Sequence, residues 1–180
     1  MQAFKRLGLT PRVLSSFCNA VVNVFWSLIA FVPVSVFCYR FMDRVWLSVF
    51  VGTSLIAFMM PASKLKYLEL SFTIRTYRKL GVHWANHFVQ QGSLINQLLR
   101  RSYPGYQRLP SRTRMLQSTY VQERFHWTVF LFFLLSSIYA ITHGYQGWTL
   151  LITILNVIYN LYPIWLQQYI RKRLSRFRSN

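Results

Sequence analysis

Residues 125–142 read FHWTVFLFFLLSSIYAIT, and this stretch decides the class of fold. It contains no Lys, Arg, Asp or Glu. A surface helix of a soluble bundle carries a polar stripe at a period of 3.6 residues, and the VFLFFLL run in this stretch has none. The stretch is therefore typical of a helix that lies in a membrane.

Three further stretches, residues 13–39, 45–63 and 145–170, also lack charged side chains. A hydrocarbon core about 30 Å thick is crossed by about 20 apolar residues of helix. The first and last stretches reach that length alone, and the other two reach it with a turn from their flanks. The sequence predicts an all-α membrane protein with four transmembrane helices, forming a single domain over residues 1–180.

The composition of the whole chain agrees with this interpretation. Hydrophobic residues make up 53% of the 180 residues and charged residues only 13%, with 21 Lys and Arg against 3 Asp and Glu. High hydrophobicity excludes intrinsic disorder, and the lack of acidic residues excludes a soluble enzyme with a surface of paired charges. A net charge of +18 leaves a nucleic-acid binder or a membrane protein with one basic face.

The position of the charges decides between these two classes. Of the 21 basic residues, 19 precede residue 13, lie within residues 64–124, or follow residue 170, and four spans place all three of these segments on one side. Only Arg40 and Arg44 fall in a loop on the opposite side. The positive-inside rule predicts a multi-pass protein of the cell (inner) membrane with both termini in the cytoplasm. The expected partners are anionic lipid headgroups, and no nucleic acid, because no recognised nucleic-acid module is present.

The cytoplasmic segment 64–124 lies between the second and third spans. Within it, residues 67–80 place Tyr67, Leu70, Ile74 and Tyr77 at helical spacings of three and four, which predicts an amphipathic helix at the membrane surface. Gly81 is expected to end that helix. A second helix is expected to begin near Thr113 and to continue directly into the third span.

Glu123-x-x-His126 places a carboxylate and an imidazole on one helical face at a membrane boundary. Residues at this spacing act as an acid/base pair or as two metal ligands. An ionisable group at this depth is a candidate for function because charge is costly there. The alternative is that Glu123 pairs with a nearby arginine and His126 serves as an interfacial ring.

His83 and His87 have the i, i+4 spacing of two zinc ligands. No HExxH motif and no second pair of cysteines or carboxylates accompanies them. We therefore favour two interfacial histidines and predict no metal site.

The basic tail, residues 171–180, begins with the run Arg171-Lys-Arg-Leu. Basic residues next to a span are most often an anchor for anionic lipid, and we favour that interpretation. The alternative is a docking patch for a phosphate-bearing donor such as coenzyme A.

Two asparagine pairs lie inside predicted spans: Asn19 with Asn23, and Asn156 with Asn160. Amides in membrane helices ordinarily form hydrogen bonds between helices, and the alternative is that they line a polar cleft for a substrate headgroup. Pro163 is expected to kink the fourth span and to free backbone carbonyls.

Three segments together resemble a known family. They are Tyr77-Arg-Lys-Leu-Gly-Val82, then Thr119-x3-Glu123-x-x-His126-Trp127, then Asn160-Leu-Tyr-Pro-Ile-x-Leu-Gln167-x-Tyr169-x-Arg171-x-Arg173-Leu174. This arrangement resembles the glycosyl-4,4'-diaponeurosporenoate acyltransferases, small membrane proteins of carotenoid glycoside biosynthesis. The resemblance covers roughly residues 65–175.

The resemblance implies that the protein transfers an acyl group to a hydroxyl of a lipid-linked or carotenoid glycoside at the cytoplasmic membrane face. It implies His126 and Glu123 as catalytic residues, with His126 as the base and Glu123 orienting it. It implies a substrate-binding set formed by Asn160, Gln167, Tyr169, Arg171 and Arg173. No permanently bound cofactor is expected, and acyl-CoA or another acyl donor is a possible co-substrate. The competing hypothesis is a non-catalytic membrane subunit, with protein partners in a larger membrane complex.

Overall fold

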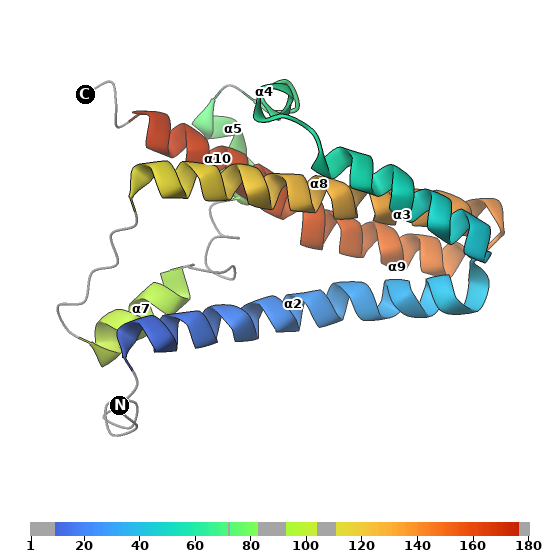
Figure 1. Cartoon of the computed structure of the whole chain (residues 1–180), viewed down its shortest axis with the longest axis horizontal. Coiled ribbons are helices and arrows are strands. Elements are labelled where there is room, and N and C mark those ends of the chain that lie inside the picture. The colour runs from blue at the N-terminus through green and yellow to red at the C-terminus, as the bar shows by residue number, and fades with distance from the viewer. Residues whose placement is uncertain (1–9, 72, 83–92, 104–110, 177–180) are drawn as a thin grey trace.

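The computed structural model describes residues 10–71, 73–82, 93–103 and 111–176, and every regular element within these ranges is a helix (Figure 1). The predicted all-α class is confirmed. In chain order the elements are α2 (Pro11–Phe41), α3 (Arg44–Phe58), α4 (Ala62–Leu65), α5 (Ile74–Lys79), α7 (Ser93–Ser102), α8 (Arg112–Thr142), α9 (Gln146–Asn156), the π-helix η1 (Val157–Leu161) and α10 (Tyr162–Arg176).

Three helices in the described ranges are long and apolar enough to cross a membrane: Pro11–Phe41, Arg112–Thr142 and the continuous run Gln146–Ser175. In their most apolar windows only 22%, 33% and 39% of the residues are buried inside the protein. Most of their apolar side chains therefore face outward. Exposure of such side chains to water is unfavourable in free energy, whereas exposure to the lipid of a bilayer is not. A membrane protein is the class of fold that these helices fit.

The second predicted span corresponds to α3, which is shorter than the sequence led us to expect. Asp43 caps its first turn by accepting a hydrogen bond from Val45 N at 2.7 Å, and the helix ends at Phe58. Its 15 residues extend about 22 Å, less than a hydrocarbon core of about 30 Å. The residue before a proline disfavours helical backbone, so Pro61 prevents the uncharged stretch from continuing as one helix. A complete fourth span remains a prediction.

The helices run back and forth along one axis. The short turns between α2 and α3 and between α8 and α9 lie at one end of the molecule, and the first turn of α2 and the last turn of α10 lie at the other (Figure 1). Gly144 forms the second turn with a φ of 78°, a conformation that glycine adopts without strain. An aromatic cluster packs this end, with Phe37 against Tyr139, Tyr145 and Trp148.

The first half of α2 lies apart from the other long helices (Figure 1). Its second half packs in the aromatic cluster with α8 and α9, whereas Leu14 near its start packs against Leu99 of α7. Between these regions the Ser27 hydroxyl and the Tyr159 phenol of η1 form a hydrogen bond of 3.0 Å. Both cysteines, Cys18 and Cys38, are free thiols on α2.

The segment between α3 and α8 folds back on α10, and its structure corrects one expectation. The predicted amphipathic helix over residues 67–80 is present only as α5, and Gly81, with a φ of 71°, ends it as predicted. The preceding residues form turns because side chains of α5 and α10 bind their backbone groups. The expected start of the third long helix near Thr113 is confirmed, since α8 begins at Arg112.

Candidate functional site

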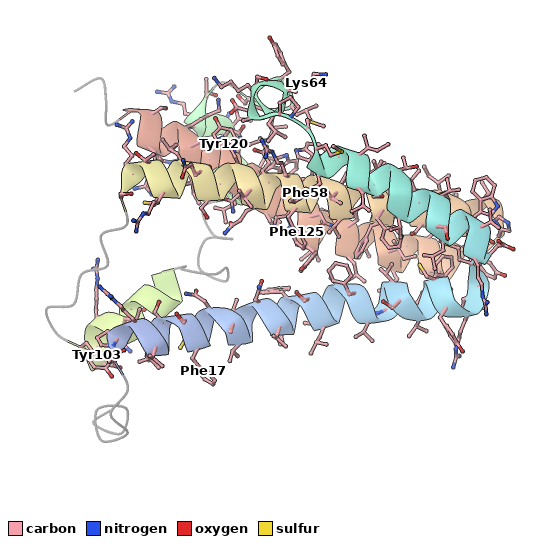
Figure 2. All side chains as sticks on the ribbon, in the orientation of Figure 1. Phe17, Phe58, Lys64, Tyr103, Tyr120 and Phe125 are labelled. Atoms are coloured by element: carbon pink, nitrogen blue, oxygen red, sulfur yellow. The ribbon has the colours of Figure 1, made fainter. Side chains whose placement is uncertain are left out.

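Glu123 lies on α8 with none of its side chain exposed. It precedes Thr142, the last residue of α8, by about 29 Å of helix, which is close to the thickness of a hydrocarbon core. If the turn end of the bundle lies at one membrane surface, Glu123 lies at the other. In Figure 2 the labelled Tyr120 and Phe125 mark the stretch of α8 that carries it.

Four charged side chains, Glu69, Glu123, Arg171 and Lys172, form what we call the charged cluster. Arg171 Nη1 lies 2.5 Å from Glu123 Oε2, and Arg171 Nη2 lies 3.5 Å from Glu69 Oε1. Lys172 Nζ lies 2.5 Å from Glu69 Oε2. Two of the three carboxylates in the chain thus neutralise two cations, as buried charges require.

Arg171 is also held by an aromatic ring. Its guanidinium carbon lies 4.4 Å from the centre of the Tyr120 ring, one turn before Glu123 on α8. Only 5% of the Arg171 side chain is exposed. The first arginine of the basic tail is therefore an internal ion-pair partner of α8, which sets it apart from a free lipid anchor.

Gln168 connects the charged cluster to the segment before α5. Its Nε2 donates to Glu123 Oε1 at 2.8 Å and to the Leu68 carbonyl at 3.3 Å. Its Oε1 accepts from Leu70 N at 3.2 Å and from the Tyr77 hydroxyl at 3.0 Å. Both donor and both acceptor positions of this amide are used, so Gln168 fixes the path of residues 68–77 against α10.

The Tyr77 phenol is suited to this role because it stays protonated. Its side chain is fully buried, and this burial raises the pKa of Tyr77 above its ordinary value. A protonated phenol keeps the hydrogen that it donates to Gln168. The phenol oxygen also accepts from Ser71 N at 3.3 Å.

The sequence analysis did not identify Gln168, Glu69 or Tyr120 as parts of the site. The available signal was the pair Gln167-Gln168 inside an apolar helix, directly before the first arginine of the tail. A buried amide in such a position requires partners. The partners come from elements distant in sequence, so the pattern alone does not name them.

A second polar group, which we call the amide chain, consists of His126, Asn160 and Asn156. His126 Nδ1 lies 3.5 Å from Asn160 Oδ1. Asn160 Nδ2 donates to Asn156 Oδ1 at 2.8 Å, and Asn156 Nδ2 donates to the Phe130 carbonyl at 3.1 Å. The Tyr159 ring meets the imidazole edge to face, with centroids 5.7 Å apart.

The predicted partnership of Glu123 with His126 is not present in the part of the chain that the structure describes. The two residues share α8, but Glu123 binds Arg171 and Gln168 while His126 turns to Asn160. A separation of three residues brings side chains near one another without aligning them, and partners from α10 (for Glu123) and from η1 (for His126) decide each orientation. The alternative interpretation, a pairing of Glu123 with an arginine, describes this carboxylate.

The remaining predicted residues have different environments. Gln167 donates to Gln122 Oε1 at 2.7 Å, which links α10 to α8. Tyr169 packs in an apolar cluster with Tyr77, with ring centres 6.5 Å apart. Arg173 is exposed in the last turns of α10. Asn160 lies in η1 and is fully buried.

His83 and His87 lie outside the described residues. Within the described ranges, no group of three or more His, Cys, Asp or Glu side chains is arranged to hold a metal ion.

The comparisons with known proteins point to one family. A family model described as glycosyl-4,4'-diaponeurosporenoate acyltransferase matches residues 61–180, two thirds of the chain, and this confirms the resemblance seen in the three motifs. Neither the curated proteins nor the solved structures give a match. The matched range contains the charged cluster and the amide chain, whereas α2 and α3 lie before it.

Proposed function

Because the chain belongs to the glycosyl-4,4'-diaponeurosporenoate acyltransferase family, we propose that it is an integral membrane enzyme that acylates a hydroxyl of a lipid-linked or carotenoid glycoside. The family description supplies the reaction class, and the apolar helices agree with an acceptor that resides in the membrane. The acceptor hydroxyl reacts at the cytoplasmic face of the cell membrane, the side to which the basic residues assign both termini.

The observation that carries the proposal is the environment of His126. This residue follows Glu123 by about 4.5 Å along α8, so it lies just inside the apolar region beneath the charged cluster. Its imidazole is partly buried and bound to an amide oxygen that orients it. An oriented imidazole at the boundary between charged and apolar surroundings is suited to a substrate with a polar head and an apolar tail.

In the proposed reaction His126 acts as general base. It removes the proton from the acceptor hydroxyl while the hydroxyl oxygen forms a bond to the acyl carbon. The bond between the acyl carbon and the leaving atom of the donor then breaks, and the proton passes from His126 to that leaving atom. With an acyl-CoA donor the leaving atom is the thioester sulfur, so the products are an ester and a thiol.

The other predicted residues receive roles that follow from their surroundings. Arg173, exposed at the end of α10, is the candidate to bind the phosphates of an acyl-CoA donor. Asn160 contacts the base itself. Glu123, Arg171, Gln167 and Tyr169 hold α8, α10 and α5 together and thereby keep the site in shape.

A non-catalytic membrane subunit is the second candidate. The observation that favours it is that the described carboxylates of the charged cluster are already engaged in ion pairs, as expected for structural groups. In this case the protein would copurify with partner proteins from mild detergent and would not transfer acyl groups alone.

The test uses the purified full chain in lipid nanodiscs with an acyl-CoA donor and a membrane glycoside acceptor. We expect His126→Ala to lower the rate by about 100- to 10,000-fold, the usual contribution of a general base. His143→Ala is the matched control, since His143 is exposed at the opposite, turn end of the bundle. An unchanged rate in His126→Ala would remove this residue from the mechanism. An inactive wild type that copurifies with a stable partner would support the subunit instead.

A further inference from the structure

In the amide chain, one backbone carbonyl determines which side-chain atom donates and which accepts in each hydrogen bond. The Phe130 carbonyl can only accept, so the Asn156 amide must present its nitrogen to it, at 3.1 Å. Asn156 Oδ1 is then left to accept from Asn160 Nδ2, at 2.8 Å. Asn160 in turn has its Oδ1 directed at His126.

An amide oxygen cannot donate, so the nitrogen of His126 that faces it must carry a hydrogen. That nitrogen is Nδ1, at 3.5 Å. A neutral imidazole has one hydrogen, and if Nδ1 holds it, Nε2 has a free lone pair. The distance is at the long end for a hydrogen bond.

The backbone is shaped to make this contact. Asn160 lies in the five-residue π-helix η1, where the backbone departs from regular α-helical hydrogen bonding. Such π-helical turns are frequent at functional sites. Asn156 is the last residue of α9, one turn earlier. The Tyr159 ring packs against the imidazole and is itself tied to Ser27 of α2, which restricts rotation of the imidazole.

We infer that Asn160 and Asn156 are positioning residues that hold His126 in the tautomer with hydrogen on Nδ1, so that Nε2 is the atom that accepts the proton of the substrate hydroxyl. The inference rests on the proposed function for its catalytic part. It assigns to an amide chain the orienting task that the sequence analysis gave to Glu123, and it names the reacting atom. Glu123 has no part in it, because its oxygens are bound by Arg171 and Gln168.

The experiment is nitrogen NMR of the full chain labelled with ¹⁵N-histidine in lipid nanodiscs, combined with acyl-transfer rates. The chain has four histidines, and His126→Gln identifies the resonances of His126. In the wild type we expect a protonated Nδ1 and an unprotonated Nε2. Asn160→Ala should lose the preference for hydrogen on Nδ1. It should also lower the acyl-transfer rate at least about tenfold, a loss smaller than the whole contribution of a general base.

Two further variants separate positioning from loss of fold. Asn160→Asp keeps an oxygen facing Nδ1, so it should retain the tautomer and be faster than Asn160→Ala. Asn156→Ala removes the acceptor that fixes the Asn160 amide, so the tautomer preference should weaken although Asn160 is unchanged. Asn23→Ala is the matched control, an exposed asparagine of α2, and should leave both readouts at wild-type values.

The outcomes distinguish the inference from the proposed function. A hydrogen on Nε2 in the wild type, or an unchanged tautomer and rate in Asn160→Ala, would overturn the inference while the acyltransferase function stands. An inactive wild type with hydrogen on Nδ1 would refute the proposed function and retain the hydrogen-bond assignment.

Discussion

Glu123 and Arg171, on two different long helices, form an ion pair of 2.5 Å in which the carboxylate is fully buried. The pair joins α8 to α10 at the depth where the apolar part of α8 begins. Around it, Glu69 and Lys172 complete a neutral cluster of four charges. Through Gln168 this cluster is connected to the segment before α5.

Removal of one partner of this pair should destabilise the protein strongly. Glu123→Gln leaves the Arg171 guanidinium with the longer ion pair to Glu69 as its remaining carboxylate contact, and loss of one partner of a buried pair costs about 3–5 kcal/mol. SDS-induced unfolding in mixed micelles measures the change. Arg173→Gln, an exposed arginine of the same helix, is the control and should change stability by less than about 0.5 kcal/mol. Equal stability of both variants would contradict the structural role of the pair.

Loss of the Gln168 amide should release the segment that it holds. Gln168→Leu removes four hydrogen bonds, each contributing about 1 kcal/mol, and leaves the Glu123 carboxylate with one partner fewer. Limited trypsin digestion with mass spectrometry should show faster cleavage at Lys66 and Arg75 on either side of the segment. Gln117→Leu, at an exposed site on α8, should leave the cleavage pattern unchanged. Wild-type protection in Gln168→Leu would show that other contacts hold the segment.

Stability should fall above about pH 10 because of Tyr77. Burial raises the pKa of this phenol in the folded protein above the ordinary value of 10.0. Between these two values the unfolded chain loses the proton while the folded chain keeps it. The contribution is therefore complete below pH 10.0 and declines as the pH rises toward the folded pKa. Melting temperatures measured between about pH 8 and 11 should show a smaller decline in Tyr77→Phe, and Tyr67→Phe, 88% exposed, should behave as the wild type.

Membrane topology can be tested with single cysteines in a chain with Cys18→Ser and Cys38→Ser. An impermeant maleimide should label Ser175→Cys from the cytoplasmic side and Gln146→Cys from the opposite side, because these exposed positions lie at opposite ends of α9–α10. Ser63→Cys, just after α3, decides the number of spans. Four spans predict labelling of Ser63→Cys from the cytoplasmic side. Labelling from the opposite side, with Gln146→Cys and Ser175→Cys exchanging sides, would limit the protein to three spans.

The helical class and the long helices could be predicted because they follow from local composition. The uncharged stretch at residues 125–142 requires a helix in an apolar solvent wherever it packs, since backbone groups in lipid must be satisfied within the segment. Pro61 and Gly81 likewise mark chain breaks by their own geometry. The length of α5 was not predictable in this way, because the backbone before it is held by Gln168, a residue far along the chain.

The sequence by itself determined that this chain is an apolar helical protein, that nearly all its basic residues are confined to a few segments, and that residues 61–180, which include Glu123, His126 and Asn160, match one family. Only the tertiary structure decided which of them act together. Spacing along one helix suggested Glu123 as the partner of His126, whereas the packing of α10 and η1 against α8 gives Arg171 to the first and Asn160 to the second. The physical reason is that a buried charge requires an opposite charge, and the buried part of an imidazole requires a hydrogen-bond partner. Both requirements are met by side chains that approach across helices.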